Sequence, residues 1–325
     1  MMARRLLAAL GAVALIAAAL VVRAVVLDGG VGGNGNGKDA PAASRTAVCA
    51  TELAAACQDA GFADVTVEAP GVTADRLAAG KRLGADVWVA TTPWPAMVTS
   101  SRRDARLGEV GPPLASSSLL LVTTGDRFGA LSGRCDPFGW RCLGDLVGTP
   151  WAELGVNGPT MAIGVDPADS TAGLLTVGGL VAGWFEGEGI APTALATNDL
   201  ELDDSFRDWL GRLAASSRVR SPGSGSVLER FVAAPAGGST VTAFESDVSR
   251  VVVGAAVSRF AHAAPGPLVA TQAVVVGGAS DDVRTALRRA LRDAGWAAPT
   301  ADAATGLPNS GVMVALRDRW RQLTR

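Results

Sequence analysis

The sequence predicts an α/β protein whose mainly parallel sheet is flanked by helices. Short apolar runs typical of strands alternate with helix-like segments along most of the chain, and this alternation is typical of parallel sheets covered on both faces. Hydroxyl residues stand where several predicted strands give way to helices, which is the edge at which such sheets bind ligands. With 325 residues, 48% of them hydrophobic, the chain is long enough for two domains of ordinary size.

The amino-terminal 28 residues predict a membrane or export segment. Arg4 and Arg5 precede an apolar run over residues 6–22, and after Arg23 a further apolar stretch follows. A basic flank before such a run predicts an inside amino terminus and an exported remainder. Residues 1–28 are therefore a signal anchor or a signal peptide. The absence of a small-x-small cleavage site favours an uncleaved anchor, with the folded body outside the cytoplasm; cleavage would give a secreted protein.

Residues 29–45 are rich in glycine and contain no core-forming run. This composition predicts a flexible linker between the membrane segment and the folded body.

Four cysteines fit an oxidising compartment. Cys49 and Cys57 are eight residues apart, and Cys135 and Cys142 are seven apart. Two local disulfides are the simplest of the three possible pairings, and four free buried thiols are the alternative.

The first part of the folded body predicts three strands, each followed by a helix. We expect strands at residues 46–50, 65–69 and 86–90, and helices at residues 51–60, at 72–79 and from 94 to 98 onward.

The later part is less regular. We expect strands at residues 119–123, 162–165, from 240 onward and at 268–276, a loop at 125–139, and helices from 171 onward and at 203–216, 227–231, 281–294 and 312–323.

The start of the helix after residue 170 is the best-marked local feature. Ser170 or Thr171 can cap it, since a short hydroxyl side chain accepts bonds from unpaired backbone N–H groups. A helix start of this kind also suits an anion or a carboxylate. The alternative is an ordinary strand–turn–helix unit without a ligand.

Composition gives no support for catalysis or for nucleic-acid binding. His262 is the only histidine, and we expect it at a helix end or in a loop. Tyrosine is absent. No histidine metal cluster is therefore available, and no C-x-x-C or G-x-S-x-G motif occurs. The net charge of −2 gives no argument for a nucleic-acid partner. We expect a protein that is not an enzyme and that needs neither a metal nor a cofactor.

Three signals in one order carry a resemblance to a known family. The first comprises Ala85-Asp86, Ala90, Trp94 and Met97, the second Ser118-Leu119, and the third Asp166-Pro167 with Ala172-Gly173. Together they resemble bacterial extracellular solute-binding proteins of the type II periplasmic-binding fold, in particular the molybdate-binding-like branch. The carboxyl-terminal segment GLPNSGVMVALRDRW is similar to actinobacterial membrane-anchored members, and the resemblance covers roughly residues 46 to 320.

The resemblance implies two lobes, each with a mainly parallel sheet flanked by helices, and a ligand in the cleft between them. Lobe 1 would comprise residues 46–122 and 266–325, and lobe 2 residues 123–265. Thr91 would then lie opposite the helix start at Thr171. Expected ligand contacts, by position in the family pattern or beside those positions, are Thr51, Thr73, Ala90, Thr91, Thr92, Ser170, Thr171 and Ala172.

The function implied is capture of a small solute, with an anion as one possibility, for an ABC-type permease or a sensor. The alternative is a cell-envelope interaction module that uses the same fold without a transported ligand. Glu245 and Asp247 form either a solvated turn or a site for a cation.

Overall fold

The computed structural model describes residues 45–102, 107–216, 226–235, 240–300 and 306–325. The predicted membrane segment and nearly all of the predicted linker lie outside these residues. Within the described ranges, no helix has the length and apolar character needed to cross a membrane.

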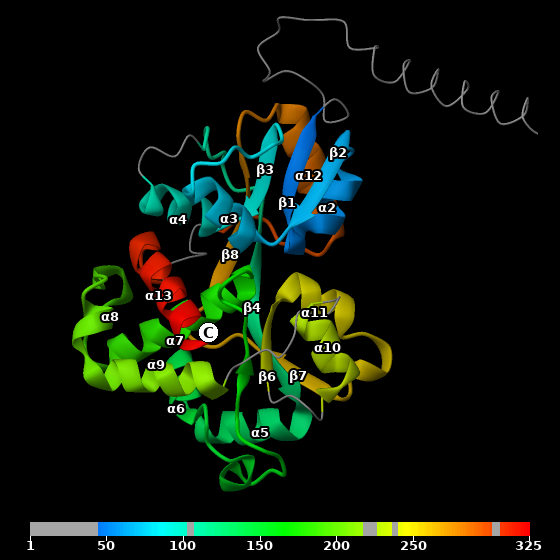
Figure 1. Cartoon of the computed structure of the whole chain (residues 1–325). Coiled ribbons are helices and arrows are strands. Elements are labelled where there is room, and N and C mark those ends of the chain that lie inside the picture. Colours follow the sequence, from blue (N-terminus) through cyan, green and yellow to red (C-terminus); the bar gives the residue numbers. More distant parts are fainter. Residues whose placement is uncertain (1–44, 103–106, 217–225, 236–239, 301–305) are drawn as a thin grey trace, which may run out of the picture. The chain divides into compact units, whose positions relative to one another are not determined.

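The first region of the sheet is built on strand β1 (Thr46–Ala50). It pairs in parallel with β2 (Asp64–Glu68) and with β3 (Val87–Thr91). All five residues of β3 are buried, as expected for a strand covered on both faces. Beyond β3, the strand β8 (Ala270–Val276) pairs antiparallel with β3. Its other edge pairs with the first four residues of β4 (Ala115–Thr124) (Figure 1).

The second region starts within β4 (Ala115–Thr124), which is shared by both regions. Its later residues pair antiparallel with β6 (Thr240–Phe244) and β7 (Phe260–Ala263), and β6 pairs in parallel with the short β5 (Ile163–Gly164). The α/β class with flanking helices is confirmed. The second region is more antiparallel than expected, because its strands β6 and β7 both run antiparallel to the shared strand β4.

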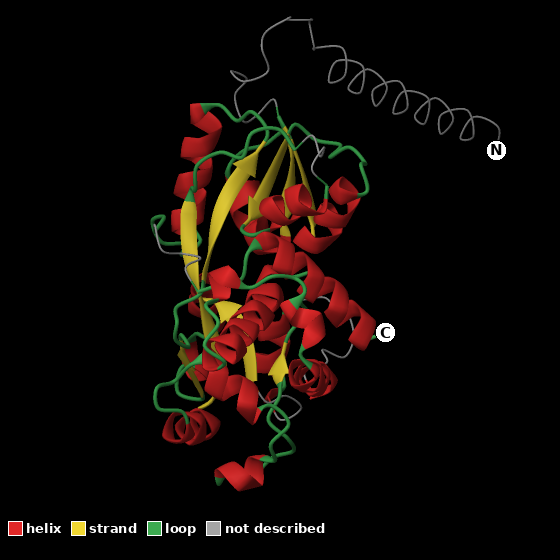
Figure 2. Cartoon of the chain, turned by 90° about the vertical axis from the view of Figure 1, so that its left-hand side faces the viewer, coloured by secondary structure: helices red, strands yellow, loops and turns green. Residues whose placement is uncertain are grey.

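Helices cover the strands on both sides in the upper part of the view in Figure 2. The described helices of six or more residues are α2 (Ala54–Asp59), α3 (Pro70–Ala78), α4 (Trp94–Ser101), α5 (Gly125–Arg134), α6 (Trp140–Leu146), α7 (Thr171–Gly187), α9 (Asp204–Ser216), α10 (Val227–Ala233), α11 (Glu245–Val251), α12 (Asp281–Asp293) and α13 (Ser310–Leu323). Shorter turns are η2 (Thr51–Leu53), η3 (Trp151–Leu154), η4 (Pro192–Ala194), α8 (Asp199–Leu202) and η6 (Gly254–Ala256).

Two local predictions were wrong. The segment expected to be a loop at residues 125–139 contains helix α5, whose three glycines lower its helix propensity and hid its apolar face. His262 lies in strand β7, not at a helix end or in a loop, and its backbone pairs with Val122 of β4.

Both predicted disulfides are confirmed. Cys49 at the end of β1 is bonded to Cys57 in α2, and Cys135 after α5 is bonded to Cys142 in α6. The alternative of four free thiols is thereby ruled out.

Helix α7 is the central helix of the body, because 13 of its 17 residues are buried. Its glycines allow close packing: a Cβ atom on Gly183 would lie 2.5 Å from the backbone nitrogen of Arg141 in α6. Helix α13 packs against α4, α7 and α9, so it contacts elements next to both sheet regions. The lobe boundaries stay a prediction, and the first of them falls within the shared strand β4.

Candidate functional site

The start of α7 is capped as the sequence predicts. The Ser170 hydroxyl accepts a hydrogen bond from the backbone N–H of Gly173 at 3.0 Å and donates one to the carbonyl of Asp166 at 2.8 Å. This bonding fixes the first turn of the helix and leaves Thr171 as its first residue, almost fully buried.

Thr171 joins the start of α7 to the first sheet region. Its Oγ1 lies 2.7 Å from Oγ1 of Thr91, the last residue of β3, and accepts a hydrogen bond from Nε1 of Trp94 at 2.8 Å. Trp94 is the first residue of α4 and is fully buried. The carboxyl end of one strand and the starts of two helices therefore meet at a single point.

A carboxylate of the chain completes this junction. Oε1 of Glu52, in η2 after β1, accepts hydrogen bonds from the hydroxyls of Thr91, at 2.8 Å, and of Thr171. Its other oxygen accepts from Thr51 at 3.1 Å. We call Glu52, Thr91, Trp94 and Thr171 the seam cluster. Sequence reasoning named Thr51 as a ligand contact but not the adjacent Glu52, although an acid beside a hydroxyl at a strand end was the available signal.

The other predicted residues serve nearby parts of the structure. Thr73 is buried and donates to Glu68, while Ala90 lies buried within β3. The Thr92 hydroxyl accepts from the backbone N–H of Gln272 at 3.0 Å, and the carbonyl of Ala172 accepts from Thr176. The structure thus brings Thr51, Thr91 and Thr171 together around Glu52, and bonds the side chains of Thr73, Thr92 and Ser170 elsewhere.

Arg317 of α13 contacts several of the elements that surround the seam cluster. Its guanidinium lies 4.9 Å from the centre of the Trp94 ring, and Nη1 bonds the carboxylate of Asp75 in α3 at 2.7 Å. Its Nε donates to the carbonyl of Ala168, in the loop before α7, at 2.7 Å. Burial opposes ionisation of Asp75, but hydrogen bonds from Arg321 and Arg317 outweigh it and lower the pKa of this carboxyl below its usual value.

The charge of Glu52 acts on a second carboxylate, which belongs to the second sheet region. Burial raises the pKa of Asp247 in α11, the ion pair with Arg250 at 3.1 Å opposes this rise, and the negative charge of Glu52 adds to it. Sequence reasoning named Asp247 as part of a solvated turn or a cation site, but the structure places it in the first turn of helix α11.

The polar groups of the seam cluster suit a donor-rich ligand better than an oxyanion. The hydroxyls of Thr91 and Thr171 already bond a carboxylate, so an anion placed there would meet a like charge. Among the described residues, no group of three or more His, Cys, Asp or Glu side chains could hold a metal ion.

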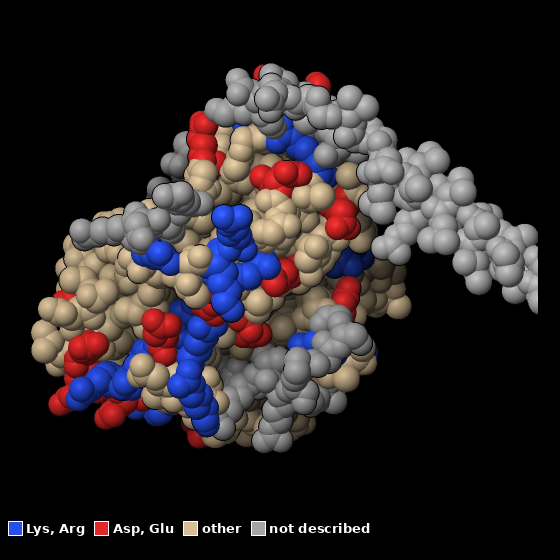
Figure 3. Space-filling view, turned by 45° about the horizontal axis from the view of Figure 1, so that its top comes forward, with Lys and Arg blue, Asp and Glu red and all other residues tan. Residues whose placement is uncertain are grey.

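On the face shown in Figure 3, a row of Lys and Arg side chains runs down the middle with acidic side chains beside it.

No protein-family model matches this sequence, and no curated protein matches it. Its fold is similar to that of iron-bound HitA from Pseudomonas aeruginosa, with a TM-score of 0.53 and 13% identity over 86% of this chain and 99% of that one. It is also similar to a periplasmic thiamin binding protein, with a TM-score of 0.50 and 12% identity over 86% and 96% of the two chains.

These similarities confirm the predicted fold, which is shared with solute-binding proteins over most of the described body. Neither structure singles out the molybdate-binding-like branch or the membrane-anchored type, and both of these assignments stay predictions.

Proposed function

We propose that this chain is an extracytoplasmic solute-binding protein that captures a small solute at the seam cluster and presents it to an ABC-type transporter or a sensor. The observation that carries the proposal is the meeting of Thr91 and Thr171 with Glu52, at the end of one strand and the start of the central helix. Ligands of α/β folds bind at such strand ends. Support also comes from the fold shared with two solute-binding proteins.

The proposed solute is a small cation or a molecule rich in hydrogen-bond donors. Glu52 takes up the hydroxyl groups that an anion would need. A buried charge is stabilised by an opposite charge and destabilised by a like one. This proposal narrows the small solute expected from the sequence, for which an anion was one possibility.

A solute can enter the seam cluster only if Thr91 and Thr171 move apart. The two threonine oxygens of the seam cluster are 2.7 Å apart, which is hydrogen-bond distance and leaves no room for a ligand between them. The described arrangement is therefore a closed form in which Glu52 bonds the groups that would face the solute.

Thermal unfolding in the presence of candidate solutes tests the proposal. The panel comprises spermidine, thiamin, arginine, glucose, sulfate and molybdate. A bound ligand at 100 times its dissociation constant adds about 2.7 kcal/mol to the free energy of unfolding, so we expect a clear rise in the melting temperature with at least one cationic solute and none with the two oxyanions. Stabilisation by sulfate or molybdate alone would overturn the solute class.

The second candidate function is a cell-envelope interaction module without a transported solute. It is favoured by the direct bonding of the seam cluster to its own side chains. For such a module we expect no stabilisation by any member of the panel, and a melting temperature that rises only with a protein partner.

An extracytoplasmic location follows from the proposed function and agrees with two disulfides, which form in oxidising compartments. Cell fractionation with the full chain and with a chain lacking residues 1–28 tests both location and anchoring. We expect the full chain in the membrane fraction, digestible by protease added outside the cell, and the shortened chain in the cytoplasm.

A further inference from the structure

A second candidate site lies at the opposite end of β3 from the seam cluster. A cavity of about 620 Å³ opens where β3 begins and β8 ends. Trp88, which lines it, is three residues before Thr91 and pairs in register with Val276. At about 3.3 Å per strand residue this separates the two places by about 10 Å along the strand.

The wall of the cavity is apolar and contains one unusual donor. Leu77, Leu83 and Leu107 line it together with Trp88, whose side chain is fully buried. The indole N–H of Trp88 is one of three buried side-chain polar atoms that lack a hydrogen-bond partner within the described residues. Unpaired buried donors are rare in folded proteins, so this one points to a group that the described residues do not supply.

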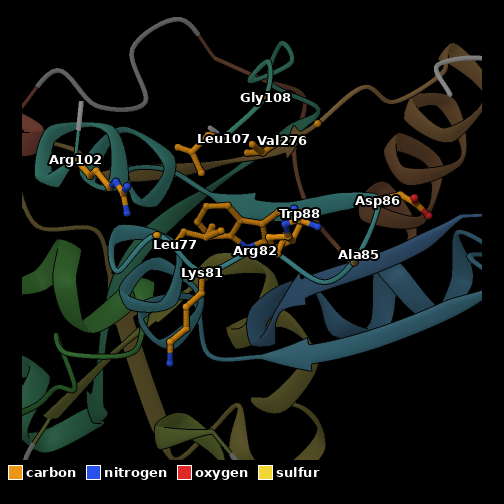
Figure 4. Close-up of a pocket in the computed structure, with 13 residues that line it drawn as sticks. Leu77, Lys81, Arg82, Ala85, Asp86, Trp88, Arg102, Leu107, Gly108 and Val276 are labelled. Carbon is orange, nitrogen blue, oxygen red and sulfur yellow. The ribbon is translucent and has the colours of Figure 1, made fainter. Parts of the chain in front are cut away.

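The polar part of the lining is basic. Lys81, Arg82 and Arg102 line the cavity, and in Figure 4 Arg102 lies on one side of the Trp88 ring while Lys81 extends outward. Lys81 and Arg82 form no ion pair with any carboxylate in the part of the chain that the structure describes.

The one acidic side chain of the lining is engaged elsewhere. Asp86 accepts hydrogen bonds from the backbone N–H of Thr46 at 2.8 Å and from its hydroxyl at 3.0 Å, and Figure 4 shows its carboxylate turned away from the Trp88 ring. The lining as a whole therefore carries a positive charge beside an aromatic and aliphatic wall.

We propose that this cavity binds a small organic anion with a flat apolar body, independently of the seam cluster. The apolar body packs against the leucines and the edge of the Trp88 ring, since aromatic groups favour offset or edge contacts. The acidic group lies among the basic side chains of Arg82, Arg102 and Lys81, because charge-assisted hydrogen bonds to guanidinium groups are strong. The orphan indole N–H supplies a further donor.

Calorimetric titration with 2-naphthoate tests the proposal, with the neutral 2-naphthamide and inorganic sulfate as comparison ligands. We expect one 2-naphthoate per chain, bound at least tenfold more tightly than either comparison ligand. K81A/R82A should weaken 2-naphthoate binding at least tenfold. W88F, which replaces the indole by a smaller phenyl ring without the N–H donor, should weaken it severalfold.

The matched control is R288A/R289A, which removes two adjacent exposed arginines from α12. It should leave 2-naphthoate affinity unchanged, and so should T171V at the seam cluster. No binding of 2-naphthoate to the wild-type protein, or equal binding to K81A/R82A and to wild type, overturns the proposal. Loss of 2-naphthoate binding in T171V instead places the ligand at the seam cluster and also overturns it.

Discussion

At the scale of single residues, Thr171 lies within hydrogen-bond distance of all three other members of the seam cluster. Its hydroxyl accepts from the indole of Trp94 and donates to Glu52. Thr171→Val keeps the volume but leaves both partners without this bond. A buried donor without its acceptor costs about 1–3 kcal/mol, and urea denaturation should show a loss of that size.

Thr171→Ser is the matched control for this substitution. It keeps the hydroxyl and removes one methyl group, which costs about 1 kcal/mol or less. A valine variant that is as stable as the serine variant would contradict the role given to the hydroxyl.

Asp75 makes a prediction about pH. Because its pKa is lowered in the folded protein by Arg321 and Arg317, its ionisation contributes stability above the ordinary value of 3.8, and this contribution is lost as the pH falls through the folded-state pKa. Asp75→Asn should therefore be less stable than wild type at neutral pH, and the difference should shrink in strongly acidic solution. Denaturant titrations at several pH values measure it, and a difference that does not change with pH would refute the account.

At the scale of secondary structure, the packing of α7 against α6 depends on a missing side chain. A Cβ atom on Gly183 would come within 2.5 Å of a backbone nitrogen of α6, which real Cβ atoms do not tolerate. Gly183→Ala should force the helices apart and destabilise the protein by about 1–3 kcal/mol, as overpacking does. Thermal or chemical unfolding measures the change.

Gly211→Ala in α9 is the matched control. Nothing lies within 4 Å of the added Cβ atom, and alanine is favoured over glycine in a helix by about 0.5–1 kcal/mol. The two substitutions should therefore have opposite signs. If both stabilised the protein, the close approach of α6 and α7 would not be a constraint.

Local patterns explain which elements could be predicted from the sequence. The strand at Thr46–Ala50 and the capped helix from Thr171 carry their own signals in spacing and capping residues, and the two disulfides join cysteines less than ten residues apart. Helix α5 was missed because its glycines made the segment resemble a loop. The antiparallel pairing in the second region was missed because the direction of a strand relative to its neighbour depends on which segments pair with β4. No local pattern in the sequence gives that pairing.

At the scale of the whole molecule, the site depends on contacts between distant parts of the chain, which no local pattern reveals. Glu52 bonds Thr171 across 119 residues, and Arg317 bonds Asp75 across 242. The sequence indicated the strand end at Thr91 and the helix start at Thr171 as opposing partners. It could not show that a carboxylate of the chain bonds both of them, and for this reason an anion was kept as one possible ligand.

The central claim is that a solute binds at the seam cluster through Glu52. Calorimetric titration of the cationic solute that stabilises the protein most, against wild type and Glu52→Gln, tests it most directly, with the exposed Glu153→Gln as control. We predict one solute per chain, at least tenfold weaker binding to Glu52→Gln and no change for Glu153→Gln. Equal affinity for wild type and Glu52→Gln would contradict the account.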